Sequence, residues 1–462
     1  MSTRRADLST LYWAEYAWIG GLMNPGRQAE SVTIEVRNGR IDHVTAEVTD
    51  VPKGATVLAG LTLPGMANTH SHAFHRVLRG AEPVADAGAD SFWSWRDQMY
   101  EAANRLTPES YGRLAADVFT EMVQAGYTAV GEFHYIHHEP DGRPYGDQHA
   151  MELAVVEAAR SAGIRITLLD TCYLRSGFGA RSVDDEQRRF SDGTAENWEA
   201  RIESLARAIR GRPSVRLGAA IHSMRALSPK DAEVVIRWAQ TRSLPLHVHV
   251  SEQPEENRQS LKHHGATPTE LLLQAGIENL SGPFCAVHAT HLSDSDVRTY
   301  GRARAFISCC PTTERVLADG ISPTGALVQA GARLCVGSDS QSVIDPFEEL
   351  RAVEMHQRLA TGRRGTHTPA ALLHAGSVDG YKSIGWQKGG SIEAGALADF
   401  VSLSVMGDRL RGLAVRDFAS GAVLAATASD VHHVVVNGDV VVRDGRSVRR
   451  PSMPDAPLGS AS

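Results

Sequence analysis

The sequence predicts an α/β protein: a (βα)₈ barrel of the TIM type joined to a small β-sandwich built from both ends of the chain. Eight short apolar runs with the length of buried strands alternate with segments of helical spacing. Both chain ends instead alternate Val, Ile and Thr with polar residues. The length of 462 residues leaves room for a barrel of ~250 residues and a second module.

The strand-like runs follow one another at 61–70, 128–136, 165–174, 215–224, 244–252, 284–292, 304–313 and 333–341. Helical spacing lies between them at 111–126, 151–163, 231–242, 267–276, 293–303 and 324–331. Several of these helical segments close with Gly, the residue that most often ends a helix. Because buried strands alternating with helices are typical of a parallel barrel, we expect the barrel to occupy residues 64–390.

Hairpin signals mark both ends of the chain. The motifs "RNGR", "VNGD" and "RDGR" stand between alternating apolar and polar residues, which favours tight turns between antiparallel strands. We expect residues 1–63 and 391–450 to form one composite β-sandwich domain. Residues 451–462, rich in Pro, Ser and Ala, are predicted to be a disordered tail.

Composition and charge argue against several classes of partner. A net charge of −7 without a long Lys/Arg run does not suit nucleic-acid binding. No apolar run approaches the ~20 residues that span a bilayer, and the N-terminus lacks the pattern of a secretory signal, so we expect no membrane association. The five cysteines include no Cys-x-x-Cys pair, which is typical of reduced thiols in a cytoplasmic protein.

Polar side chains gather where the strand-like runs end. Six of the eight runs finish in His, Asp or Glu, and the carboxyl ends of barrel strands form the functional face. His70 and His72 would point to the same side of a strand, although a lone His-x-His can also be a solvated turn. His249 and Asp339, from the fifth and eighth runs, add an imidazole and a carboxylate. This donor set suits Zn²⁺ with an open position for water.

Five segments carry a family resemblance: "PGMANTHSHAFHR", "GEFHYIHH", "HVHVSEQ", "VHATHLSD" and "GSDSQ". In this order and across nearly the whole chain they resemble the amidohydrolase superfamily. A narrower resemblance, carried by "GEFHYIHH", "HVHVSEQ" and "PGMANTHSHAFHR", is to the formimidoylglutamate deiminases. These enzymes convert N-formimidoyl-L-glutamate to N-formyl-L-glutamate and ammonia in histidine degradation. The resemblance implies a barrel, a catalytic metal and hydrolysis of a linear amidine.

The resemblance also implies roles for single residues. The metal ligands would be His70, His72, His249 and Asp339. Asp339 would also accept a proton from water, His288 would orient or polarise that water, and Glu252 would carry a proton to the substrate nitrogen.

Substrate recognition is implied by the same resemblance. The substrate carries two carboxylates, and Arg binds a carboxylate through two parallel hydrogen bonds. The positions that match family residues for recognition are Arg225, Arg96, Tyr135 and His222. His75 stands where the family often has Gln, which leaves its own substrate contact open.

We expect one Zn²⁺ per chain. Dinuclear members of the superfamily usually bridge their metals with a carbamylated Lys at the end of the fourth strand. Between His72 and His249 the only lysine is Lys230, at the start of a helical segment. A bridge by Cys172 or by a carboxylate is the alternative. The expected partners are a small-molecule substrate with two carboxylates and a second copy of the chain in a homodimer.

Two other function classes stay open. One is a superfamily deaminase that acts on a purine, pyrimidine or triazine ring, whose site would favour aromatic stacking over paired arginines. The other is a binding or regulatory protein that kept the barrel and lost its chemistry. Such a protein should lack a metal ligand or Glu252, and this chain has the complete set.

Overall fold

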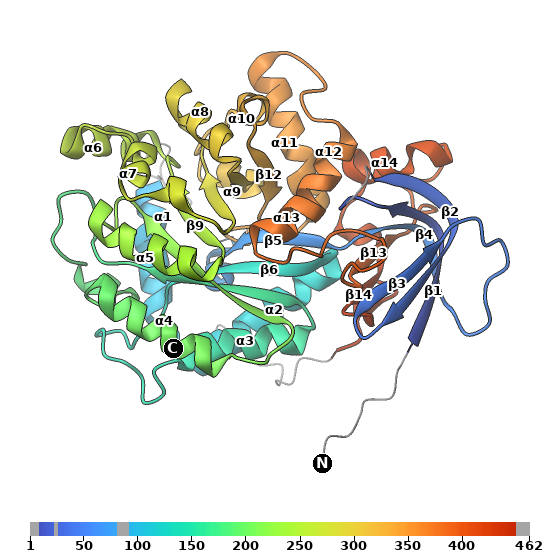
Figure 1. The fold of residues 1–462 in the computed structure, drawn as a ribbon, viewed down its shortest axis with the longest axis horizontal. Coiled ribbons are helices and arrows are strands. Elements are labelled where there is room, and N and C mark those ends of the chain that lie inside the picture. Colours follow the sequence, from blue (N-terminus) through green and yellow to red (C-terminus); the bar gives the residue numbers. More distant parts are fainter. Residues whose placement is uncertain (1–8, 23–25, 81–91, 450–462) are drawn as a thin grey trace.

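The computed structural model describes residues 9–22, 26–80 and 92–449, and the tail predicted at 451–462 lies outside these ranges. Two sheets of eight strands each organise the described chain. Figure 1 shows a barrel wrapped in helices on the left and the second sheet against its right side. The predicted fold class, a (βα)₈ barrel with a smaller β-unit from both chain ends, is confirmed.

All eight barrel strands run parallel and follow the chain in order. They are β5 (Met66–Ser71), β6 (Tyr127–His134), β7 (Arg165–Cys172), β8 (Val215–Ser223), β9 (Leu246–Val250), β10 (Phe284–His288), β11 (Phe306–Cys309) and β12 (Arg333–Val336). Most of their residues are buried, because helices cover one face and packed side chains fill the other. A parallel bridge between Ser71 and Asp339 closes the circle.

Most of the helices lie around the outside of this barrel, whereas the last one, α14, lies beside the second sheet (Figure 1). Their bounds are α1 (Phe92–Asn104), α2 (Pro108–Ala125), α3 (Ala150–Ala162), α4 (Ala195–Ala208), α5 (Pro229–Arg242), α6 (Pro254–His264), α7 (Pro268–Gln274), α8 (Asp294–Ala303), α9 (Pro311–Val316), α10 (Thr324–Ala330), α11 (Pro346–Thr361), α12 (Pro369–His374), α13 (Gly380–Ser383) and α14 (Phe418–Ala425). Helix α2 shows why the sequence signals work. The Thr107 hydroxyl accepts from the Ser110 amide at its start, and Gly126, with φ 104°, ends it.

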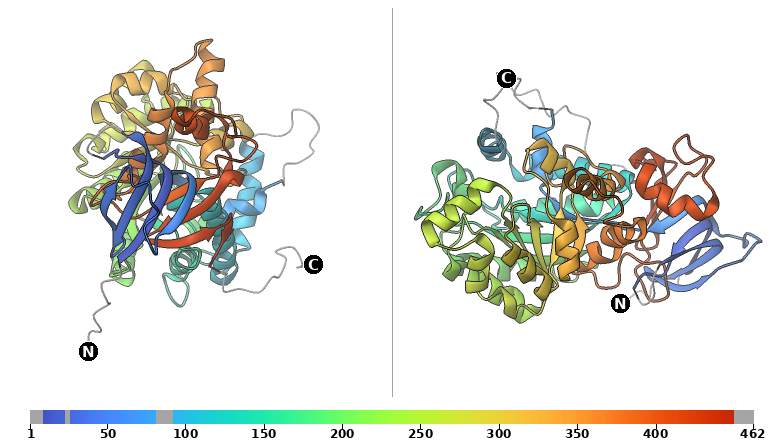
Figure 2. Two further views of the ribbon diagram at one scale, coloured as in Figure 1. Left: turned by 90° about the vertical axis from the view of Figure 1, so that its right-hand side faces the viewer. Right: turned by 90° about the horizontal axis from the view of Figure 1, so that it is seen from above.

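The second sheet takes strands from both ends of the chain, which lie side by side in Figure 2 (left view, blue and red). Its order is β16 (Arg446–Ser447), β15 (Asp439–Arg443), β14 (Val431–Val436), β13 (Phe400–Leu403), β4 (Thr56–Pro64), β1 (Ser9–Ile19), β2 (Arg27–Arg37) and β3 (Arg40–Thr45). Only β1 and β4 pair in parallel. The sheet has a core of its own, in which Tyr12, Ile34 and Phe400 are buried.

The predicted hairpin turns are present. Asn38–Gly39, Asn437–Gly438 and Asp444–Gly445 each have two consecutive residues with φ between 52° and 79°. Two positive φ values in a row are the mark of the tight turn that matches the twist of antiparallel strands, and Asn-Gly and Asp-Gly adopt it with little strain.

A buried ion pair joins the barrel to the second sheet. The Arg165 guanidinium, at the start of β7, donates to Asp399 through Nε at 2.6 Å and Nη2 at 3.0 Å. The Tyr381 hydroxyl and the Asn437 amide donate to the same carboxylate, at 2.8 and 2.7 Å. The side chains of Arg165 and Asp399 are 2% and 0% exposed, so each charge depends on the other for compensation.

All five cysteines are buried thiols without a disulfide. Within 9–22, 26–80 and 92–449, no helix combines the length and apolar character that crossing a bilayer requires.

Arg165→Met should destabilise the fold strongly, because it leaves the Asp399 carboxylate buried without its cation. Breaking a buried pair from one side costs about 3–5 kcal/mol, so the urea midpoint should fall sharply. Arg160→Met, which removes an exposed partner of Glu157, is the control and should leave the midpoint nearly unchanged. Equal midpoints for the two variants would show that the pair does not hold the sheets together.

Candidate active site

The first and last strands of the barrel, β5 and β12, are joined by backbone hydrogen bonds at its functional face. The Asp339 amide, just after β12, donates to the His70 carbonyl at 3.0 Å, and the His72 amide donates back to the Asp339 carbonyl at 3.2 Å. This pairing brings a residue from each end of the barrel sequence into contact. Closure of the barrel therefore makes the predicted ligands of the first and eighth strands neighbours.

A chain of buried hydrogen bonds holds this seam. Asn68 Nδ2 donates to Ser338 Oγ at 2.6 Å, Ser338 Oγ donates to Gln341 Oε1 at 2.8 Å, and Gln341 Nε2 donates to Ser71 Oγ at 2.9 Å. Ser71 Oγ donates in turn to Glu132 Oε2, on β6, at 2.6 Å. Every hydroxyl in the chain both accepts and donates, so the His-Ser-His segment is held in one position.

Two imidazoles have their tautomers fixed by the backbone. His72 Nδ1 lies 2.8 Å from the Phe133 carbonyl oxygen, and His249 Nδ1 lies 2.8 Å from the His222 carbonyl oxygen. Since a carbonyl oxygen only accepts, both Nδ1 atoms carry the proton. Burial lowers the pKa of His72 and of His249 well below the usual range, so neither ring takes a second proton. Nε2 of each ring is therefore unprotonated and carries a lone pair.

These lone pairs face a common point. His72 Nε2 and His249 Nε2 are 3.4 Å apart, and His70 Nε2 is 3.1 Å from His249 Nε2. Asp339 Oδ1 lies 3.5 Å from His70 Nε2 and 3.6 Å from His72 Nε2. Facing lone pairs repel each other unless a cation lies among them. Three imidazole nitrogens and one carboxylate oxygen are a donor set that fits a zinc ion.

Backbone strain accompanies the site. Ala289, next to His288, has φ 49°, and Gln341, two residues after Asp339, has φ 61°, in the left-handed region that residues other than Gly, Asn, Asp and His seldom adopt. His288 and Asp339, with φ 64° and 46°, lie in the same region. Such strain persists only where the surroundings enforce it, and it is most frequent at functional sites.

Carboxylates surround the His288 imidazole. Its Nε2 lies 3.6 Å from Glu252 Oε1 and 3.8 Å from Asp339 Oδ2, and its Nδ1 lies 3.4 Å from Glu314 Oε1. Burial alone would lower the pKa of this imidazole, but these carboxylates raise it to about 10. Burial raises the pKa of Glu252, against the opposing effect of His288 and Arg225. Glu252 is therefore a carboxyl that can change protonation state nearer neutral pH than an exposed glutamate.

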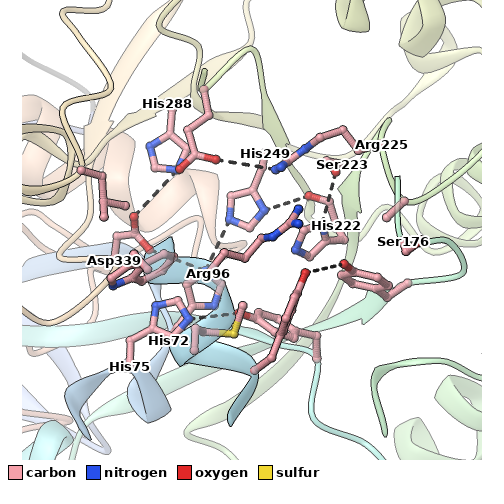
Figure 3. Close-up of a pocket in the computed structure, with 18 of the residues that line it drawn as sticks. His72, His75, Arg96, Ser176, His222, Ser223, Arg225, His249, His288 and Asp339 are labelled. Atoms are coloured by element: carbon pink, nitrogen blue, oxygen red, sulfur yellow. Dashed lines mark hydrogen bonds and ion pairs between the residues drawn. The ribbon is translucent and has the colours of Figure 1, made fainter. Parts of the chain in front are cut away.

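A pocket opens in front of these groups (Figure 3). Its lining contains all of the predicted catalytic residues, Glu252, His288 and Asp339, and two further predicted metal ligands, His72 and His249. It also contains all of the predicted substrate-binding residues: His75, Arg96, Tyr135, His222 and Arg225. His70 is not part of the lining and is fully buried. Arg225 Nη2 is 3.7 Å from Glu252 Oε2, so one arginine of the lining lies next to a carboxylate of the site.

His75 and His222 are polar but uncharged parts of this lining. His75 Nε2 lies 3.0 Å from the Tyr135 hydroxyl, and burial lowers the pKa of His75 to about 3. Burial and the nearby Arg225 and Arg96 lower the pKa of His222 well below its usual range. The fixed positive charges of the lining therefore come from the arginines and not from these imidazoles.

Lys230 is exposed on the first turn of α5. It is therefore not at the end of β8, where a bridging lysine would stand.

The sequence prediction omitted Tyr100 and Tyr173, which also line the pocket. Tyr173 follows directly on Cys172, the last residue of β7, so its place at a strand end was a usable signal. A strand-end rule restricted to His, Asp and Glu misses this tyrosine. Tyr100 lies on α1, outside the barrel strands, and no local pattern indicated it.

Comparison with known proteins gives a consistent family. Residues 61–441 match the model of the Amidohydrolase family. Formimidoylglutamate deiminase from Pseudomonas aeruginosa is 37% identical over 404 residues, which cover 85% of this chain and 87% of that protein. The 5-methylthioadenosine/S-adenosylhomocysteine deaminase from Halobacterium salinarum is 27% identical, with 86% of this chain and 85% of that protein covered.

Solved structures agree in fold. An amidohydrolase from Brucella melitensis superimposes with a TM-score of 0.86 at 33% identity, over 95% of this chain and 96% of that chain. An adenosine deaminase from Xanthomonas campestris with bound zinc gives a TM-score of 0.79 at 22% identity, over 96% and 94% of the two chains. At that identity the likeness concerns the fold alone.

Proposed function

The chain belongs to the amidohydrolase family, whose enzymes are metal-dependent, and we propose that it is a zinc-dependent deiminase that hydrolyses N-formimidoyl-L-glutamate to N-formyl-L-glutamate and ammonia. The 37% identity to a formimidoylglutamate deiminase supports this choice within the family. The pocket supplies a separate chemical reason.

One observation carries the proposal: Arg96 and Arg225 line the same pocket as His249 and Asp339 (Figure 3). Each guanidinium can bind one carboxylate through paired charge-assisted hydrogen bonds. A substrate with two carboxylates at one end and a hydrolysable amidine at the other therefore matches the charges of this lining. A neutral ring would offer no carboxylate to either guanidinium.

His70, His72, His249 and Asp339 would hold the zinc ion. Zinc, when bound, supplies the Lewis acidity that makes water a nucleophile at neutral pH. Around it, the chain supplies the groups that move protons. Asp339 accepts a proton from the attacking water, and His288, with Nε2 3.8 Å from Asp339 Oδ2, orients that water.

Glu252 connects the water to the leaving group. It delivers one proton to the imino nitrogen of the substrate as the water oxygen adds to the formimidoyl carbon, which gives a tetrahedral carbon bearing OH and NH₂. The hydroxyl proton then passes through the carboxylates to the NH₂ nitrogen. The C–N bond breaks, and a formyl C=O and ammonia remain. A carboxyl whose pKa is raised by burial is suited to both transfers.

The alternative is deamination of a purine or a related ring, as the name of the 27% identical relative indicates for that protein. Tyr100, Tyr135 and Tyr173 in the pocket could stack on a ring. The two arginines favour the dicarboxylate.

Ammonia release from N-formimidoyl-L-glutamate, 5-methylthioadenosine and guanine should be measured at equal enzyme concentration. We expect the highest kcat/KM for formimidoylglutamate, loss of turnover with a chelator, and recovery on addition of Zn²⁺. Preferential turnover of either ring substrate would contradict the proposed function.

Elemental analysis of the purified protein should find one zinc per chain, because the donor set is complete and no lysine is placed to bridge a second ion. His72→Asn should lose most of the zinc. His432→Asn, which alters a second group of potential ligands in and next to the second sheet (half-buried His432, buried His433 and exposed Asp444), is the control and should keep it. Two tightly held metals per chain, or zinc retained by His72→Asn, would contradict the single site.

Glu252→Gln should keep its zinc and lose most of its turnover, since the amide preserves shape but carries no proton. General acid-base groups typically contribute about 10²–10⁴-fold. In the wild type, activity should fall as the pH rises through the raised pKa of Glu252, because the deprotonated carboxylate then has no proton to deliver to the imino nitrogen. Near-normal kcat in Glu252→Gln would assign the proton transfer to another residue.

Arg225→Met should lower kcat/KM on formimidoylglutamate by about 10- to 100-fold, since a charge-assisted hydrogen bond contributes roughly 1.5–3 kcal/mol. Zinc content should not change. Arg175→Met is a matched control, because Arg175 also lines the pocket but Nη2 is 2.8 Å from Asp231 Oδ2; its effect should be small. Formamidine, which has no carboxylate, should be turned over equally poorly by wild type and Arg225→Met. Equal loss on both substrates would give Arg225 a structural role instead.

A further inference from the structure

Two tyrosine hydroxyls meet inside the pocket. Tyr100, on α1, and Tyr173, just after β7, lie with their hydroxyl oxygens 3.4 Å apart. Both residues are 4% exposed, and both line the pocket with Arg96 and Arg225. The Arg96 guanidinium lies 5.5 Å from the centre of the Tyr100 ring, so the hydroxyl pair stands beside the groups that would bind carboxylates.

Gln187 gives this pair a direction. It lies in the short helix η2 (Asp185–Phe190), and its side chain is buried. The Asp184 amide donates to Gln187 Oε1 at 3.1 Å, which identifies that atom as the oxygen and leaves the NH₂ group on the other side. Gln187 Nε2 then donates to the Tyr100 hydroxyl at 2.8 Å. Tyr100 is therefore an acceptor in its contact with Gln187.

The Tyr100 hydroxyl, which accepts from Gln187, is expected to donate to the Tyr173 hydroxyl. A hydroxyl that accepts a hydrogen bond becomes a stronger donor, so a head-to-tail chain from Gln187 through Tyr100 to Tyr173 is favoured. In that chain the Tyr173 oxygen accepts, and its own O–H is left to donate. Burial raises the pKa of Tyr173 well above its usual range, more than the nearby Arg225 and Arg96 lower it, so the phenol keeps its proton.

We propose, on the basis of the proposed function, that Tyr173 is a further specificity-determining residue: its O–H donates to a substrate carboxylate between Arg96 and Arg225, and Gln187 and Tyr100 are positioning residues that set its direction. A carboxylate offers about four acceptor positions on its two oxygens, so a bidentate arginine leaves room for a phenol donor. The arginines supply charge, and the phenol adds a fixed direction.

Tyr173→Phe removes the last donor and keeps the ring. Its kcat/KM on N-formimidoyl-L-glutamate should fall about 10-fold or more, mainly through KM, while turnover of formamidine and zinc content stay at wild-type values. Tyr300→Phe is the control, because the Tyr300 hydroxyl is also buried but bonds Thr269 on the outer helices. Wild-type kcat/KM in Tyr173→Phe would overturn the proposal.

Gln187→Glu separates direction from packing. The carboxylate still accepts from the Asp184 amide, but its other oxygen now accepts from Tyr100 where the amide donated. The chain then runs from Tyr173 to Tyr100 to Glu, and no hydroxyl proton faces the substrate. We expect a loss similar to that of Tyr173→Phe, and no further loss when the two changes are combined. Independent, additive losses would show that Gln187 acts only on the fold.

Binding of glutarate to the zinc-loaded protein distinguishes failure of this proposal from failure of the proposed function. Glutarate has two carboxylates and no amidine, so its Kd does not depend on turnover. Weaker glutarate binding by Tyr173→Phe would support the donor even if formimidoylglutamate were not a substrate. Unchanged Kd in Tyr173→Phe, with tight binding by the wild type, would overturn the donor while leaving the deiminase proposal intact.

Discussion

Closure of the barrel between its first and last strands is the contact on which the site depends. The backbone hydrogen bonds between His70, His72 and Asp339 complete the circle of strands and at the same time set three of the four candidate metal donors side by side. The seam formed by Asn68, Ser71, Ser338, Gln341 and Glu132 holds them there. A barrel that failed to close would lose the donor set as well as the fold, so stability and chemistry rest on the same residues.

Burial divides the pocket into two electrostatic regions. On the floor, it keeps His72 and His249 neutral, with lone pairs facing inward, which is the state that a metal requires. At the wall, Arg96 and Arg225 contribute guanidinium cations. One pocket is therefore lined by neutral imidazole nitrogens and by guanidinium cations. This arrangement suits a substrate with an amidine at one end and anions at the other.

The sequence was most informative where local pattern determines position. Period-two alternation predicts that His70, in β5, and His72, just after it, point to one side, and the strand-end rule brings His249, His288 and Asp339 to the same face. The hairpin turns followed from Asn-Gly and Asp-Gly. Tyr173 stands at the end of β7 and could have been found by the same rule, whereas Tyr100 and Gln187 could not, because long-range packing that no short segment encodes brings α1 and η2 to Tyr173. The structural role of Glu132 was likewise hidden, since its partners, Ser71 and the Ala73 amide, lie about 60 residues earlier in the chain.

The most direct test is a crystal structure of the zinc-loaded protein with N-formyl-L-glutamate, with anomalous scattering recorded at the zinc edge. The account predicts one anomalous peak bounded by His70, His72, His249 and Asp339, the formyl group of the product next to it, and the two product carboxylates on Arg96 and Arg225. A peak elsewhere, a second peak of equal height, or carboxylates directed away from both arginines would contradict it.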